Sequence, residues 1–265
     1  MPTPPPSIEP LAHGVYVIDT GFVRPRFDAS HLIVEDGRAA FVDTGTNHAV
    51  PRLLQALAAL GLARDAVDYV IATHVHLDHA GGAGALLQHL PNAKLVVHPS
   101  GTRHLVDPSR LLASARSVYG DAEVARSYGE LVPVPPQRVL ETEDGQVLQL
   151  AGRALQFIHT PGHARHHHCI WDERSGGMFT GDTLGVAYPE FSSAGRPWLI
   201  PATPPTQFDP EALSASVRRV LGFDPQRLYL THYGEVTDVA TLGATFLARL
   251  AQIVQLGAKG ARARL

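Results

Sequence analysis

Residues 68–82 constrain this chain more than any other stretch, because ligand-type side chains follow directly on a buried strand. Residues 69–71 are apolar and rich in β-favouring side chains, which predicts a strand in the core. The small residues 80–83 let the backbone turn sharply into a helix that runs toward Leu90. The corner between strand and helix carries His74, His76, Asp78 and His79.

These four side chains predict a metal site. In extended backbone the side chains of residues i and i+2 point to the same face, so His74 and His76 can bind one ion. Asp78 and His79 follow where the chain leaves the strand and can bind a second ion. Divalent metals such as Zn²⁺ accept imidazole and carboxylate ligands together. A polar loop with clustered histidines is the alternative, but four ligand-type residues within six positions at such a corner favour the metal site.

The pattern His74-x-His76-x-Asp78-His79 resembles the signature of the metallo-β-lactamase superfamily. This resemblance implies further ligands downstream, and three positions at the ends of predicted strands match them: His163, Asp182 and His232. The implied first metal is bound by His74, His76 and His163, the second by Asp78, His79 and His232, and Asp182 bridges the two. The resemblance covers nearly the whole chain, and the ligand set is matched without a substitution.

The chain is predicted to fold as two halves, each with strands first and helices after. The first half has strands at 15–19, 31–35, 39–43 and 95–98, a helix between Pro51 and Gly61, and helices between 100 and 130. The second half has strands at 147–150, 155–159, 169–171, 177–180 and 227–230, and helices at 210–221 and 237–256. This order of strands and helices in each half predicts two sheets whose outer faces are covered by helices.

The resemblance implies a more specific architecture within the α/β (α+β) class. It is a four-layer αβ/βα sandwich of two mixed β-sheets with outer helices. We expect a single domain over residues 1–265, with a helical insertion at 100–136 and an active-site loop at 185–206.

Composition and charge exclude some classes of function. The 265 residues are 45% hydrophobic and 18% charged with a net charge of −3, which fits a globular enzyme and lacks the basic footprint of a nucleic-acid binder. Cys169 is the single cysteine, so no intrachain disulfide can form. We find neither a signal peptide at residues 1–6 nor an apolar run of membrane-spanning length. We therefore expect a cytoplasmic protein without membrane or nucleic-acid partners, with homodimer formation through residues 100–130 and the long loop.

The implied metal centre predicts hydrolysis. Two cations lower the pKa of a bridging water, so that a hydroxide can attack an ester-like small molecule: a lactone, a thioester, or a carboxylic or phosphoric ester. We expect zinc, while iron or manganese also fits histidine and carboxylate ligands. The alternative function is a di-iron protein of the same fold that handles oxygen, nitric oxide or sulfur as a redox enzyme or a sensor.

Several side chains near the predicted ligands have two interpretations each. Asp78 is a candidate catalytic residue that carries a proton to the leaving group. Tyr188 is a candidate catalytic residue that donates a hydrogen bond to a substrate carbonyl. Tyr188, Phe191 and Trp198 together wall an apolar pocket, or they pack the loop or form a dimer contact. Asp43 orients a ligand histidine or caps a helix. His166 and His168 share a face if the run 166–168 is extended, so one of them lines the pocket or supports a ligand from behind; the alternative is a polar edge strand. His98, His104 and Cys169 are assigned structural roles.

Overall fold

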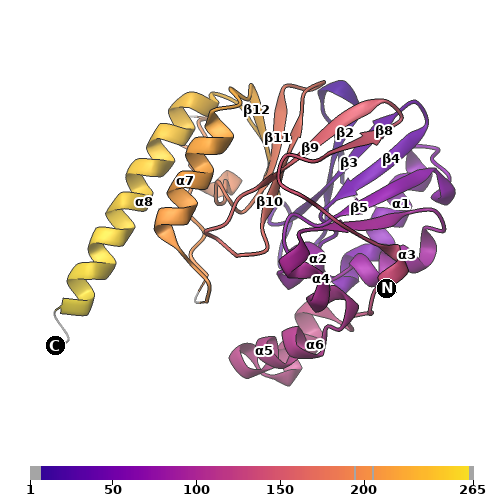
Figure 1. Ribbon diagram of the computed structural model, residues 1–265, viewed down its shortest axis with the longest axis horizontal. Helices are drawn as coiled ribbons and strands as arrows, with labels where there is room; N and C mark the ends of the chain where they lie inside the picture. Colours follow the sequence, from indigo (N-terminus) through magenta and orange to yellow (C-terminus); the bar gives the residue numbers. More distant parts are fainter. Residues whose placement is uncertain (1–6, 194, 205, 263–265) are drawn as a thin grey trace.

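The computed structural model describes residues 7–193, 195–204 and 206–262, and it contains two facing β-sheets (Figure 1). In this part of the chain the first sheet has seven strands, in the order β1 Ile8–Pro10, β2 Val15–Asp19, β3 Ala29–Glu35, β4 Arg38–Val42, β5 Val67–Ile71, β6 Lys94–Val97 and β7 Val139–Glu141. The second sheet has six, in the order β13 Gly234–Val236, β12 Arg227–Leu230, β11 Gly177–Gly181, β10 His168–Asp172, β9 Arg153–His159 and β8 Val147–Leu150.

Both sheets are mixed, as expected. In the first sheet β1 to β4 pair antiparallel, and β4 to β7 pair parallel. In the second sheet only the β11–β12 pair is parallel among the described strands. The carboxyl ends of parallel strands meet at one edge of a sheet, so β4 and β5 end together, and so do β11 and β12. These two edges carry the predicted ligands.

Helices cover the outer face of each sheet (Figure 1). The α-helices are α1 Val50–Ala59, α2 Leu77–Ala80, α3 Ala83–His89, α4 Pro99–Val106, α5 Ser109–Tyr119, α6 Asp121–Tyr128, α7 Pro210–Leu221 and α8 Val239–Arg262. The short 3₁₀ helices span 12–14, 47–49, 64–66, 136–138 and 189–191. α1 and α3 pack on the first sheet, whereas α7 and α8 pack on the second. The predicted four-layer sandwich is confirmed.

Alternation along the strands explains why the first sheet is apolar on both faces. Phe41 of β4 packs toward the helices with Leu53 and Leu57, while its neighbour Val42 packs toward the second sheet. The core between the sheets also contains Phe157 of the second sheet. Successive side chains of a strand point to opposite faces, so a central strand covered on both sides must be apolar throughout.

A buried ion pair joins the two halves at the edge opposite the predicted ligands. Arg153 at the start of β9 is fully buried, and its Nε donates to Asp172 Oδ1 at the end of β10 over 2.9 Å. The same guanidinium donates to the carbonyl of His13 over 2.7 Å and lies 3.5 Å from Glu35 of β3. A buried charge requires such pairing, and these contacts connect both sheets.

The insertion between β6 and β7 is helical as predicted, but it is divided into α4, α5 and α6. The divisions fall at Asp107–Pro108 and at Gly120, whose φ of +83° favours glycine. Val118 and Tyr119 of α5 are exposed, which suits the expected dimer surface, although the homodimer itself stays a prediction.

α8 is longer than predicted and extends past the body of the molecule (Figure 1). Leu242, Phe246 and Leu250 in its first part are buried against the second sheet and α7, whereas residues 251–258 are exposed. The expectation that no apolar run reaches membrane-spanning length is wrong for Val239–Ala258 of α8, which qualifies by length and composition alone. A core helix of a soluble protein meets the same criterion.

Candidate metal centre

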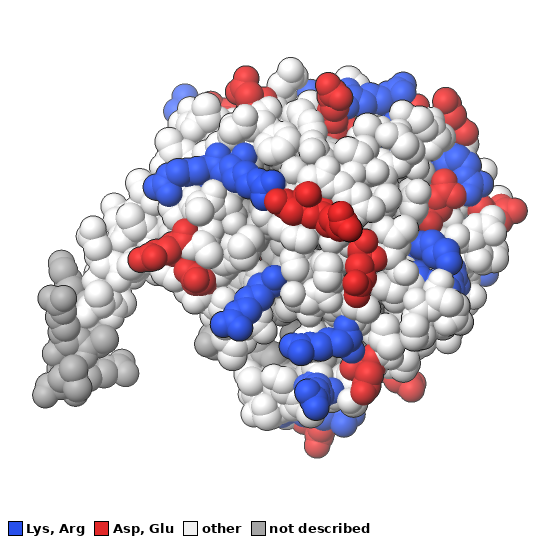
Figure 2. All heavy atoms as spheres, in the orientation of Figure 1, with Lys and Arg blue, Asp and Glu red and all other residues white. Residues whose placement is uncertain are grey.

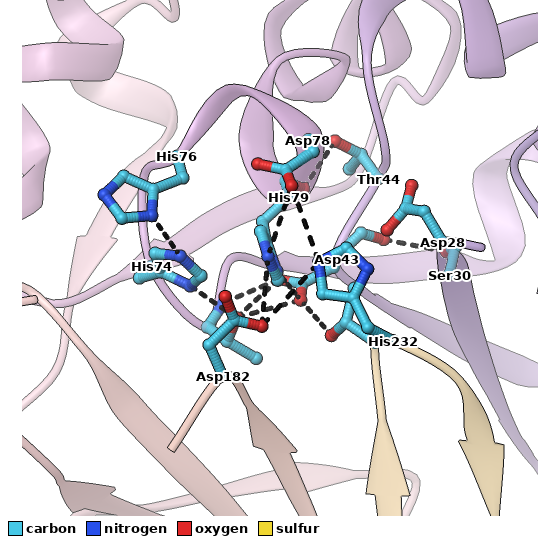
Figure 3. A network of polar contacts seen from close by, with 12 residues as sticks. Asp28, Ser30, Asp43, Thr44, His74, His76, Asp78, His79, Asp182 and His232 are labelled. Carbon is cyan, nitrogen blue, oxygen red and sulfur yellow. Dashed lines mark hydrogen bonds and ion pairs between the residues drawn. The ribbon is translucent and has the colours of Figure 1, made fainter. Parts of the chain in front are cut away.

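The corner after β5 has the predicted form. β5 ends at Ile71, the backbone bends at Thr73 and His74, and His76 is extended with φ and ψ of −63° and 151°. The four-residue helix α2 then presents Asp78 and His79 on a different side from His74. Figure 3 shows these side chains pointing toward Asp182 and His232, which come from the second sheet.

Three histidines converge on one point. His74 Nε2 lies 2.8 Å from His76 Nδ1, and His163 Nε2 lies 3.0 Å from the same His76 atom. The rings of His74 and His76 are inclined by 79°, and those of His76 and His163 by 71°. This arrangement directs three ring nitrogens at one position, as a tetrahedral metal with an open coordination site requires.

A second cluster lies beside the first and consists of Asp78, His79 and His232. Asp78 Oδ2 lies 3.5 Å from His232 Nε2 and 4.0 Å from His79 Nε2. The Nε2 atom of His79 is buried and has no hydrogen-bond partner among the described residues. A buried, unpaired nitrogen is costly unless something binds it, so its environment fits a metal ligand.

Asp182 lies between the two clusters. Its Oδ2 is 3.3 Å from His163 Nε2, whereas its Oδ1 is 3.4 Å from His79 Nε2 and 3.7 Å from His232 Nε2. Oδ1 is also buried and unpaired in the described part of the chain. One carboxylate oxygen therefore faces each cluster, which is the arrangement that a bridging ligand needs. The seven predicted ligand positions are brought together, and these donors fit two divalent cations.

Hydrogen bonds at the back of the rings select the tautomers that leave Nε2 free. His79 Nδ1 donates to Asp43 Oδ2 over 2.8 Å, and His232 Nδ1 donates to the carbonyl of Phe27 over 2.8 Å. His163 Nδ1 donates in the same way to the carbonyl of Ala202 over 3.2 Å. A ligand histidine commonly donates its other N–H to such an acceptor, which fixes the ring and increases its basicity.

Asp43 at the end of β4 orients ligands and caps no helix, which decides between its two interpretations. The N-cap of α1 is Ala49, and Asp43 is fully buried under the metal centre. Its carboxylate accepts hydrogen bonds from the backbone and hydroxyl of Thr73, from Thr231 and from His79. Because the Thr73 hydroxyl donates to Asp43, it can only accept from His74 Nδ1, 3.2 Å away.

The electrostatics of the centre follow from burial and from the mixture of charges. Burial lowers the pKa of His76 to about 4, with a further contribution from His163, so this ring is neutral at pH 7. Burial also works to lower the pKa of His232, but Asp182 and Asp78 raise it to about 9. Without a cation the His232 ring therefore carries a second proton at pH 7, and a cation that binds there displaces this proton.

Two buried side chains beside the ligands were missed by the sequence analysis as site residues. His167 Nε2 accepts the backbone N–H of Asp182 over 3.2 Å, and its Nδ1 lies 2.9 Å from the Thr160 hydroxyl, so this ring positions the bridging carboxylate. Burial raises the pKa of Asp28 to about 7, against opposing contributions from His232 and His79. The histidine run 166–168 could have pointed to His167, whereas nothing in the local sequence marks Asp28.

The structure places His166 in a turn, so the edge-strand interpretation is wrong. β10 begins only at His168, and it is an inner strand of the second sheet. The buried His166 ring instead lies 5.8 Å from the ring of His76 and lines a pocket next to the metal centre. His104 lines the same pocket, whereas Cys169 is fully buried, as expected of a structural residue.

Of the aromatic side chains in the long loop, Tyr188 alone was brought near the ligands. Its ring stacks on Phe27 at 4.7 Å and lies 6.0 Å from the ring of His232. Trp198 instead packs against Arg249 of α8 at 4.2 Å, and Phe191 is exposed. Trp198 is therefore placed against α8 and away from the ligands, while the catalytic role of Tyr188 stays a prediction.

Comparison with known proteins identifies relatives over most of the chain. The family model described as "Metallo-beta-lactamase superfamily" matches residues 23–232. The metallo-beta-lactamase fold-containing protein ST1585 of Sulfurisphaera tokodaii is 34% identical over 177 residues, which are 65% of this chain and 63% of that protein. A crystal structure of ST1585 aligns with a TM-score of 0.71 and 27% identity, covering 90% of this chain and 86% of the other.

Two further relatives carry the names of hydrolytic enzymes. The hydroxyacylglutathione hydrolase of Aeromonas hydrophila is 30% identical over 211 residues, which are 78% of this chain and 63% of that enzyme. The acyl-coenzyme A thioesterase MBLAC2 of Gallus gallus is 29% identical over 189 residues, which are 66% of this chain and 65% of that enzyme. The matches thus span less than two thirds of these curated relatives.

Proposed function

The chain belongs to the metallo-β-lactamase superfamily, and from this membership and its site we propose that it is a metal-dependent hydrolase of carboxylic esters or thioesters. The observation that carries the proposal is Asp182, with one carboxylate oxygen toward each of two ligand clusters. Relatives named hydroxyacylglutathione hydrolase and acyl-coenzyme A thioesterase support the ester class. Fold alone would not choose among substrates.

The residues of the site have separate tasks in such a reaction. Bound at the two clusters, divalent cations supply a water of lowered pKa as nucleophile and polarise the substrate carbonyl. The seven ligand side chains hold both cations, and Asp43 with His167 keeps the ligands in position. The partial exposure of His76 and Asp78 leaves the centre open to a substrate on that side.

Asp78 is our candidate for proton transfer to the leaving group. It is more exposed than the other carboxylate of the centre, with 27% of its side chain accessible against 8% for Asp182. Burial works to raise its pKa, but His79 and His232 hold the pKa well below its usual range. Such a carboxylate accepts a proton only in transit, which suits a relay between nucleophile and leaving group.

Tyr188 is our candidate for contact with the substrate. Burial raises the pKa of its hydroxyl, so the side chain stays a neutral hydrogen-bond donor. Its ring and the stacked ring of Phe27 form an apolar wall on the side of His232. Arg24, whose guanidinium lies 5.0 Å from the Tyr188 ring, pairs with Glu190 and ties the two loops together.

Metal analysis combined with a substrate panel tests the proposal. Protein purified without added metal is expected to contain about two divalent ions per chain and to hydrolyse a thioester or carboxylic ester. Asp182→Ala and His163→Ala are expected to lose metal and activity together. His89→Ala, which removes an exposed histidine at the end of α3, is expected to retain both. Full activity in a folded Asp182→Ala protein would refute the assignment.

The metal itself is part of the proposal, and zinc is our expectation. Histidine and carboxylate also bind iron, so the same analysis covers the alternative of a di-iron redox or sensor protein. Two irons per chain with a visible charge-transfer band, and no hydrolysis of any ester or thioester, would favour that alternative. A colourless protein with zinc or manganese and esterase activity would exclude it.

A further inference from the structure

A pocket of about 380 Å³ adjoins the metal centre on the outer side of His166. Its lining combines three segments that lie far apart in the sequence: α4, the turn after His163, and the loop before α7. The lining residues are Ser100, Arg103, His104, Arg165, His166 and Gln207. None of them belongs to the two ligand clusters, so the pocket is distinct from the metal sites but shares a wall with them.

His166 forms that shared wall. Its ring lies 5.8 Å from the ring of the ligand His76 on one side and 6.0 Å from the ring of His104 on the other. α4 can pack this close because of Gly101, where a Cβ atom would come within 2.8 Å of Val75 and 3.5 Å of His166. The pocket therefore begins one imidazole ring away from the metal centre.

The lining is rich in hydrogen-bond donors and in positive charge. Within the described residues, neither Arg103 nor Arg165 takes part in an ion pair, and the lining contains no acidic side chain. The Arg103 Nε–H donates to His104 Nε2 over 3.3 Å, which leaves its terminal nitrogens as donors toward the pocket. Figure 2 shows basic side chains beside a recess in the lower part of this face.

Gln207 and His104 add to the donor-rich, positively charged character of the pocket lining. The side-chain oxygen of Gln207 accepts the backbone N–H of Arg165 over 3.3 Å, so its NH₂ group remains the available donor. Burial lowers the pKa of His104, and Arg103 and Arg110 lower it further, as expected where positive charges gather. Guanidinium groups bind carboxylate and phosphate oxygens through paired hydrogen bonds, and such charge-assisted bonds are stronger than neutral ones.

We propose that this pocket binds an anionic group of the substrate, a carboxylate or a phosphate, while the ester bond lies at the metal centre. The inference rests on the proposed hydrolase function and makes it more specific. A substrate that spans both sites carries its negative charge one to two imidazole widths from the bond that is cleaved. Arg103 and Arg165 then determine which esters are accepted.

Matched substrates test the subsite. Three thioesters of equal chain length, ending in a carboxylate, a phosphate or a neutral hydroxyl, are compared by kcat/KM. The wild-type protein is expected to prefer an anionic substrate, mainly through a lower KM. Arg103→Ala and Arg165→Ala are each expected to reduce the ratio of anionic to neutral kcat/KM by about tenfold, which corresponds to one charge-assisted hydrogen bond.

Control variants separate this effect from a general loss of charge. Arg64→Ala removes an exposed arginine just before β5, whereas the metal ligands follow the other end of that strand. This variant is expected to leave the ratio of anionic to neutral kcat/KM unchanged. Arg103→Lys is expected to recover part of the preference. The carboxylate and phosphate substrates identify the chemical group that the pocket prefers. An equal kcat/KM for charged and neutral substrates in the wild type, or an equal loss for all three in the variants, would overturn the proposal.

A binding experiment keeps the two proposals distinguishable. If no ester in the panel is hydrolysed, the hydrolase proposal fails, and the subsite is tested by calorimetric titration of the metal-loaded full chain with glutarate and with inorganic phosphate. Weaker binding of either anion by the Arg103→Ala/Arg165→Ala protein than by the wild type supports the subsite. Indistinguishable binding by the two proteins overturns it.

Discussion

At the scale of single residues, Asp43 holds several groups of the candidate metal centre in position. Its two oxygens accept hydrogen bonds from Thr73, His79 and Thr231, and so connect β4 with both sheets. An asparagine in its place has the same shape but replaces one acceptor by a donor, so that at least one of these donors loses its partner. The carboxylate also sets the Nδ1–H tautomer of His79.

We predict that Asp43→Asn lowers the affinity of the second metal by about 10- to 100-fold, as is typical when the partner of a ligand histidine is changed. The loss of a buried acceptor is also expected to destabilise the fold by about 1–3 kcal/mol. Chelator competition measures the first effect, and chemical unfolding measures the second. Thr231→Val removes a single neutral donor and serves as the milder comparison. Unchanged affinity in Asp43→Asn would contradict the orienting role.

At the scale of elements, the turn after β11 shows why a glycine precedes the bridging carboxylate. Gly181 has a φ of +45°, and a Cβ atom there would lie 2.6 Å from the Thr73 hydroxyl and 2.7 Å from His167 Nε2. We predict that Gly181→Ala displaces Asp182, lowers metal content, and costs about 2–4 kcal/mol of stability through backbone strain and overpacking.

Gly61 offers a matched control for this substitution. It has a φ of +68° but no neighbour within 4 Å of an added Cβ atom, so Gly61→Ala introduces backbone strain without a clash. We expect Gly61→Ala to cost about 1 kcal/mol and to retain both metals. Elemental analysis and thermal unfolding of both variants give the comparison. Equal metal content in the two proteins would show that the close packing at Gly181 does not position Asp182.

Most helices and strands were predictable because they have strong local sequence patterns, and the elements with weak patterns were missed. Apolar runs mark the buried strands β4 and β5. Apolar periodicity marks the helix α1, and Pro51 and Gly61 mark the two ends of this helix. β1, β7 and β13 have three residues each and were not predicted, because segments this short carry too little apolar alternation to mark a strand. β7 in addition pairs with β6, which lies more than 40 residues earlier in the chain. The ligands were predictable because each follows a strand, whereas the pocket beyond His166 arises from tertiary packing alone.

At the scale of the whole molecule, the candidate metal centre joins the two halves of the chain. The first half supplies His74, His76, Asp78 and His79, and the second half supplies His163, Asp182 and His232. At the opposite edge of the sheets, Arg153 of the second half already contacts the His13 carbonyl and Glu35 of the first half without a metal. Metal binding therefore adds a second connection to a fold that retains one in the metal-free protein.

We predict from this arrangement that metal removal lowers the unfolding temperature of the entire chain and not of one half. A cation at about 1,000 times its dissociation constant stabilises the native state by about 4 kcal/mol, which corresponds to roughly 8–16 °C in a domain of this size. Calorimetry of the metal-loaded and chelator-treated protein is expected to show one transition in each case, shifted by this amount. In Asp182→Asn the shift is expected to shrink, because one of the two bridging oxygens is replaced by an amide that cannot bind a cation through nitrogen. A chelator that shifts only part of a two-step transition would mean that the ligands of one half hold the metal by themselves.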